Sequence, residues 1–109
     1  MGYIKHHTII VTGWSAVGIP EAHKKAKEIF KEHDLVSEIV SGLANGQSSF
    51  FIAPDGSKLG WGVSETAFTL RRDFIEFLDN YKGLDIEYVE VLFGGDDDVE
   101  AIVNTSNKI

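Results

Sequence analysis

The sequence contains no cysteine, two prolines and one methionine in its 109 residues. Without cysteine, the chain can form neither a disulfide framework nor a thiolate nucleophile or ligand. It also lacks an uninterrupted run of about 18 apolar residues, which a membrane-spanning helix requires. Its first residues show no basic region followed by an apolar run, as a secretory signal would. We therefore expect a cytoplasmic protein without a membrane partner.

Basic residues are scarce relative to acidic ones. The chain has 10 lysines and arginines against 17 aspartates and glutamates, which gives a net charge of −7. Binding of DNA or RNA depends on basic side chains that neutralise phosphates, so nucleic-acid polymers and anionic membranes are not expected partners. A pocket for one small anion is still compatible with this charge, because a local field can differ from the mean.

Apolar periodicity divides the chain into six expected elements. The pattern predicts strands at Tyr3–Thr12, Leu35–Leu43, Ser48–Ala53 and Ile86–Phe93, and helices at Pro20–His33 and from Ser64 or Thr66 to Lys82. This order is typical of an α+β fold of the ferredoxin-like, split βαβ type, with a four-stranded antiparallel sheet and two helices on one face. Residues 1–95 should form a single domain. Residues 96–109 are acidic and then polar, which predicts either a frayed tail or a short extra strand.

Three segments give the sharpest structural expectations. Residues Thr8 to Thr12 are all β-branched, so their strand should be central, with both faces covered. The Asn45-Gly46 pair is typical of a tight hairpin between the second and third strands. The second helix has one apolar face that should contact the core, made by Leu70, Phe74, Phe77, Leu78 and Tyr81.

The connection between the first strand and the first helix is one candidate site. It contains Trp14 and Ser15 beside a helix start, where unpaired backbone amides can hold an anion. It is not a Walker phosphate loop, because Ile19-Pro20 follows Gly18 where Lys and Ser or Thr are required. The alternative is an ordinary connection in which Trp14 lies at the edge of the core.

A second candidate site is the loop Ala53–Trp61. It combines turn-forming residues with a lysine and an aromatic, and Arg71 and Arg72 of the following helix should face the same region. The alternative is a structural loop in which Trp61 covers the core and Lys58 is solvated. The complete set of predicted ligand-binding residues is His7, Trp14, Ser15, Ser57, Lys58, Trp61, Arg71 and Arg72. Antiparallel strands place the two tryptophan loops at opposite ends of the sheet, so a site with both tryptophans requires a second subunit.

Catalysis and metal binding have no support from residue spacing. His6 and His7 are neighbours on a strand and point to opposite faces, and His23 and His33 are ten apart on a helix, so neither pair has ligand spacing. The run Asp96–Asp98 lacks the alternation and terminal glutamate of a calcium loop. No Ser-His-Asp or paired-carboxylate arrangement can be assembled. We therefore expect a protein that is not an enzyme and has no cofactor and no metal.

Four segments together resemble small uncharacterised proteins of tailed bacteriophages. They are His7–Val11, Ala53–Trp61, Arg71–Leu78 and Val89–Gly94, and the resemblance covers most of the chain, although Leu59 stands where an acidic residue is expected. The resemblance implies a phage accessory protein in the host cytoplasm, with an anti-defence role. It implies, more specifically, a homo-oligomeric sponge that sequesters a host nucleotide signal at a subunit interface.

Two other functions remain open at this stage. A protein-interaction module could bind and inhibit a host protein through the open sheet face or an edge strand. A small enzyme of the sheet-dimer monooxygenase or isomerase type would need His6 or His7 as acid or base in a pocket beneath the helices. The fold alone does not separate these functions, because it hosts many unrelated activities.

Overall fold

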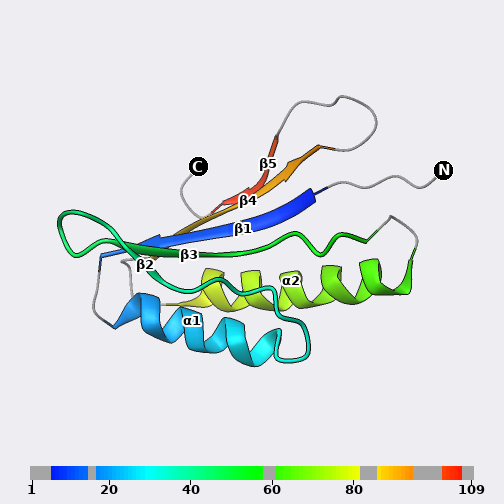
Figure 1. Cartoon of the computed structure of the whole chain (residues 1–109), viewed down its shortest axis with the longest axis horizontal. Helices are drawn as coiled ribbons and strands as arrows, with labels where there is room; N and C mark the ends of the chain where they lie inside the picture. The colour runs from blue at the N-terminus through cyan, green and yellow to red at the C-terminus, as the bar shows by residue number, and fades with distance from the viewer. Residues whose placement is uncertain (1–5, 15–16, 58–60, 82–85, 95–101, 107–109) are drawn as a thin grey trace.

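The computed structural model describes residues 6–14, 17–57, 61–81, 86–94 and 102–106. Over these residues the chain is an α+β fold with an antiparallel sheet of five strands and two helices (Figure 1). The α+β class is therefore confirmed. The elements are β1 His6–Gly13, α1 Gly18–Ile29, β2 Val40–Ser41, β3 Ser48–Ile52, α2 Gly62–Asn80, β4 Ile86–Phe93 and β5 Ile102–Ser106.

The strand order in the sheet is β2-β3-β1-β4-β5. Strand β1 is in the middle, as its β-branched residues predict, and pairs antiparallel with β3 and β4. Strand β5 adds to the outer edge of β4, with Val103 opposite Val91 and Ile102 opposite Leu92. The sheet therefore has one strand more than expected in the described residues, and part of the C-terminal segment forms the short extra strand. The acidic run at residues 96–98 lies outside the described residues.

The predicted strand Leu35–Leu43 is mostly wrong. Only Val40–Ser41 forms a ladder with β3, and Val36 makes one isolated bridge to Ile52. Ser37 explains the interruption, because its hydroxyl accepts the backbone N–H of Phe51 at 2.8 Å in place of a carbonyl. The Ser37 carbonyl lies 2.9 Å from Nε2 of His23, which ties this segment to α1.

The hairpin prediction is confirmed at Asn45-Gly46. Both residues have positive φ, 62° and 66°, and the N–H of Gln47 donates to the carbonyl of Ala44 at 3.2 Å. Two consecutive positive φ values match the twist of the flanking strands. The bounds of the helices are less well predicted: α2 begins at Gly62 with Trp61 as its N-cap, before Ser64 and Thr66, and no side-chain cap forms there.

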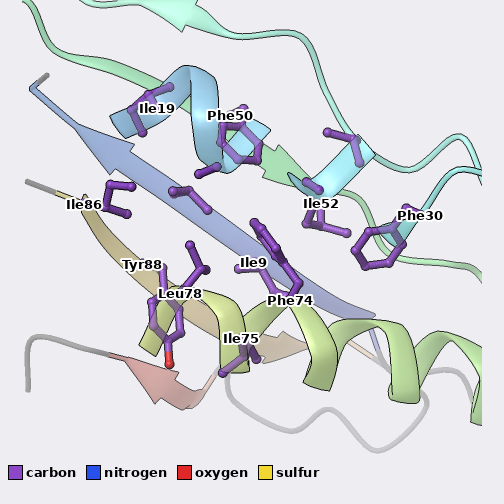
Figure 2. Close-up of a cluster of buried hydrophobic side chains, with 14 residues drawn as sticks. Ile9, Ile19, Phe30, Phe50, Ile52, Phe74, Ile75, Leu78, Ile86 and Tyr88 are labelled. Atoms are coloured by element: carbon purple, nitrogen blue, oxygen red, sulfur yellow. The ribbon is translucent and has the colours of Figure 1, made fainter. Parts of the chain in front are cut away.

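One face of the sheet packs against the two helices to make the core (Figure 2). Ile9 and Val11 of β1 are completely buried on this face, whereas Ile10 between them is 41% exposed. The expectation that β1 is covered on both faces is therefore wrong. Two helices make one layer, and a two-layer domain covers only one side of its sheet. The buried apolar residues, by element, are Ile9, Val11, Phe50, Ile52, Ile86 and Tyr88 of the strands, and Ile19, Ala22, Ala26, Ala67, Phe74, Ile75 and Leu78 of the helices.

The predicted inner face of α2 is confirmed. Phe74 and Leu78 are buried, and Leu70, Phe77 and Tyr81 pack against the core while partly exposed. Phe74 is at the centre of an aromatic group, with its ring centroid 6.3 Å from that of Phe50 and 6.5 Å from that of Phe30. Such ring pairs stabilise a core by more than their buried area alone would provide.

Replacing Phe74 with alanine should lower the free energy of unfolding by about 3 to 5 kcal/mol, because it opens a cavity in the core. Phe68 lies on the same helix but is 56% exposed, so Phe68→Ala should change the same quantity by less than about 0.5 kcal/mol. Urea-induced unfolding followed by circular dichroism measures both. Equal losses for the two variants would contradict the assignment of the buried face.

Candidate functional site

A buried ionic cluster joins α2 to the sheet at one end of the fold. We define it as Asp55, Ser57, Arg71 and Glu90. Arg71 comes from α2 and is only 4% exposed; its Nη1 lies 3.4 Å from Oδ1 of Asp55, and its Nε lies 3.9 Å from Oε2 of Glu90. Asp55 follows β3, and Glu90 is on the helix-facing side of β4. The cluster therefore connects three elements that are distant in sequence.

The turn after β3 holds Asp55 in place. Both the hydroxyl and the backbone N–H of Ser57 donate to Oδ2 of the Asp55 carboxylate. Aspartate commonly accepts from the backbone two residues further on, which stabilises a turn. Gly56 between them has φ of 80°, a left-handed conformation that glycine adopts without steric cost. The Pro54-Asp55-Gly56-Ser57 sequence therefore positions a carboxylate opposite Arg71.

The surroundings of Asp55 lower its pKa below the ordinary value of 3.8. Burial alone would raise the pKa, but the hydrogen bond from Ser57 and the positive charge of Arg71 together outweigh it. Asp55 is therefore ionised at neutral pH. In the cluster two carboxylates face one guanidinium, so the local formal charge is negative, which disfavours an anionic ligand here.

Two of the predicted ligand-binding residues, Ser57 and Arg71, thus meet in this cluster and point inward. The adjacent Arg72 is exposed instead, because consecutive helical residues point about 100° apart. Helical spacing puts Trp61, Phe68 and Arg72 in one row, because Phe68 follows Trp61 by seven residues and Arg72 follows Phe68 by four. We call these three residues the α2 outer row. Trp61 is 52% and Phe68 56% exposed, and the half of α2 that carries them extends beyond the end of α1 (Figure 1).

A small hollow lies beside the ionic cluster, between the end of α1 and the start of α2. Its volume is about 220 Å³, and its lining includes His33, Asp34, Asp55, Val63 and Leu70. Small-molecule sites usually enclose about 300 to 1,000 Å³. Two carboxylates in the lining would also repel a phosphate group. The hollow therefore fits a nucleotide poorly.

The other predicted ligand-binding residues lie apart from the α2 outer row. Trp14 follows β1 at the opposite end of the sheet, is 42% exposed, and lies near the hairpin at Gly46. His7 is half-buried, and its place in the alternation of β1 puts it on the helix-facing side. Ser15 and Lys58 lie outside the described residues. One chain therefore puts Trp61 and Arg72 on the same side of α2, about 16 Å apart along its axis, and keeps Trp14 away from both.

The face of the sheet opposite the helices is largely apolar. The strand register places Ile10 between Phe51 of β3 and Val89 of β4, in one continuous row. In the next row Val91 is opposite Val103 of β5. Ile10, Phe51 and Val103 are 41%, 44% and 51% exposed. We call this surface the uncovered sheet face.

Sequence reasoning did not select Phe68 or Glu90. The signal for Phe68 was its spacing from Trp61 and Arg72, and the signal for Glu90 was an acid in the inward set of β4, beside Tyr88. Within the part of the chain that the structure describes, no three His, Cys, Asp or Glu residues lie close enough together to hold a metal ion. Neither α1 nor α2 combines the length and the apolar composition of a membrane-spanning helix, and this covers the described residues alone.

No protein-family model matches the chain, and comparisons with curated proteins and with solved structures gave no significant match.

Replacing Arg71 with alanine should lower the free energy of unfolding by about 3 to 5 kcal/mol, because Asp55 and Glu90 would be left buried without their cation. The matched control is the exposed neighbour: Arg72→Ala should change the same quantity by less than about 0.5 kcal/mol. Urea-induced unfolding at neutral pH measures both. A loss of similar size for the two arginines would show that the cluster does not hold the fold.

The stability that Asp55 contributes should depend on pH. Its folded pKa lies below the unfolded value of about 3.8, so the contribution is fully present above that value and is lost as the pH falls through the folded pKa. The free energies of unfolding of the wild type and of Asp55→Asn should therefore differ at neutral pH and converge in acid. A difference that stays constant from about pH 6 to about pH 3 would contradict a lowered pKa.

Proposed function

We propose that this chain is a non-catalytic accessory protein that binds another protein through the α2 outer row. The observation that carries the proposal is that Trp61 and Phe68 are more than half exposed in one row along α2, and that the exposed Arg72 continues this row. Tryptophan and arginine are the residues most enriched among those that dominate the energy of protein interfaces. Arg72 also gives this row a positive charge on an acidic chain, which suits an acidic or apolar target surface.

The shape of this surface supports a protein target rather than a small molecule. A small ligand is held tightly when a concave site covers most of its surface. The α2 outer row lies along one side of a helix, and the hollow beside Arg72, of about 380 Å³, is lined by the carboxylates of Asp73, Glu76 and Asp79, which would repel a nucleotide phosphate. A protein partner needs no concavity, because it supplies the second half of the interface itself.

The proposed context is the one that the sequence resemblance implies. We propose that the fold is a ferredoxin-like split βαβ arrangement in which β5 is an addition at the edge of β4. In a phage, such a protein would act in the host cytoplasm and inhibit a host defence protein by occupying its surface. The buried ionic cluster then has a scaffolding role, since it fixes the middle of α2 against the sheet.

A nucleotide sponge is the second candidate, and one observation favours it. Trp61 and Phe68 could stack on bases, and Arg72 in the same row could contact a phosphate. This arrangement needs another subunit to enclose the ligand, because one chain leaves the row open. Native mass spectrometry of the protein, purified after exposure to host lysate, separates the two candidates. A retained mass of nucleotide size supports the sponge.

A lysate capture experiment tests the protein-binding function. The immobilised wild-type chain should enrich one host protein, and the double variant Trp61→Ala/Phe68→Ala should lose at least about tenfold of that capture, because removing interface anchors costs more than about 1.4 kcal/mol. The double variant Lys24→Ala/Lys27→Ala, at exposed positions of α1, is the matched control and should capture as the wild type does. Capture that survives in the Trp61/Phe68 variant, or that is absent from the wild type, would refute the proposal.

A further inference from the structure

The uncovered sheet face spans every strand of the described sheet. Its central row runs from Phe51 through Ile10 to Val89, and a second row places Val91 against Val103. At one end His6 packs against Phe93, with ring centroids 5.1 Å apart and ring planes tilted by 50°. Five of its large apolar side chains are 39% to 66% exposed: Ile10, Val40, Phe51, Phe93 and Val103. Contiguous exposure of this kind marks an interaction surface.

The charge of this face identifies the kind of partner. On the described strands, the one acidic residue that the register places on this face is Glu87, opposite Thr12. These strands place no lysine or arginine on this face. The chain as a whole has 27 acidic and basic residues and a net charge of −7. A partner for this face must therefore be equally apolar and nearly uncharged. A second copy of the same face meets both requirements.

The geometry of a face-to-face pair also suits a second copy. A two-fold axis brings the same patch of both subunits together, and it leaves the charged helix layers on the outside, as far apart as the fold allows. Repulsion between two chains that each have a charge of −7 is smallest in that arrangement. A shallow apolar hollow of about 250 Å³, lined by Ile10, Val40 and Phe51, gives side chains of the second copy a place to insert.

The area of the face sets the expected strength of the pair. The five strands contain 28 residues, and each residue covers about 3.3 Å along its strand and about 4.8 Å across it, which gives a footprint of about 440 Å² on each copy. Two copies would bury about 900 Å² in total, which is less than the roughly 1,200 Å² of stable interfaces and is in the range of weak, transient ones. The pair should therefore form at high concentration and dissociate on dilution.

We propose that this protein is a homodimer in which the uncovered sheet faces of two copies pack against each other. The two sheets then enclose a second apolar layer about 10 Å thick, as stacked sheets do. The α2 outer row is on the helix layer and stays outside this interface. Dimerisation and target binding therefore use different surfaces, and either can fail without the other.

Sedimentation velocity over a range of concentrations tests the homodimer. The wild type should change from monomer to dimer as its concentration rises. Phe51→Glu should raise the dimer dissociation constant at least about 100-fold, because it places a charge in the apolar contact of each copy. The matched control is Val63→Glu, at a 56% exposed apolar position of α2 that belongs to neither proposed surface, and this variant should dimerise as the wild type does.

A second variant keeps the test decisive. Val103→Glu introduces a charge on the opposite side of the face, and it should also prevent dimerisation. It replaces Phe51→Glu in the test if circular dichroism shows that Phe51→Glu is unfolded. A wild type that stays monomeric up to about 1 mM, or a folded face variant that dimerises normally, would overturn the proposal. Capture of a host protein by the monomeric Phe51→Glu variant would separate the two functions, because the α2 outer row is unchanged in it.

Discussion

The alternation of β1 at the centre of the sheet determines most of this structure. Ile9 and Val11 are completely buried under the helices, whereas Ile10 between them is 41% exposed. Both sides of the strand are β-branched and apolar, but two helices in a chain of 109 residues can cover only one of them. Over the residues that the structure describes, the domain therefore has a core on one side of the sheet and an apolar surface without a helix layer on the other.

The ionic cluster shows how the scaffold and the surface are separated on a single helix. Arg71 points into the fold, where it meets Asp55 and Glu90, and Arg72 points outward in line with Trp61 and Phe68. A buried ion pair is not a strong source of net stability, because desolvation offsets much of its attraction. Its geometric effect is larger. It specifies how α2 is rotated against β4 and the turn after β3, and that rotation decides which side chains reach the surface.

The sequence predicted what depends on local chemistry and on strong periodicity. The Asn45-Gly46 turn, the central place of β1 and the inner face of α2 around Phe74 all follow from short-range rules. The loss of the first half of the second predicted strand did not, because the Ser37 hydroxyl replaces a backbone partner there, which composition cannot show. Strand β5 depends on pairing with an exposed edge of β4 and has little apolar pattern of its own.

The candidate site was harder to predict for a related reason. Arg71 and Arg72 are chemically identical neighbours, and only the rotation of α2 separates a buried residue from an exposed one. An inner stripe drawn through Ala67, Arg71, Phe74 and Leu78 would have placed Arg71 inside, but a stripe drawn through Leu70, Phe77 and Tyr81 is equally apolar. The contact between Arg71 and Glu90 determines which stripe faces the core, and it joins residues 19 positions apart in sequence.

Thiol labelling most directly tests the claim that this sheet has one face in the core and one face that only a second copy covers. The chain has no cysteine, so Val11→Cys and Ile10→Cys each introduce a single thiol on opposite faces of β1. The account predicts that the Val11→Cys thiol reacts only when the protein unfolds. The Ile10→Cys thiol should react quickly in dilute protein and more slowly as the concentration rises. Equal protection of both thiols in dilute protein, or rapid labelling of Ile10→Cys at every concentration, would contradict it.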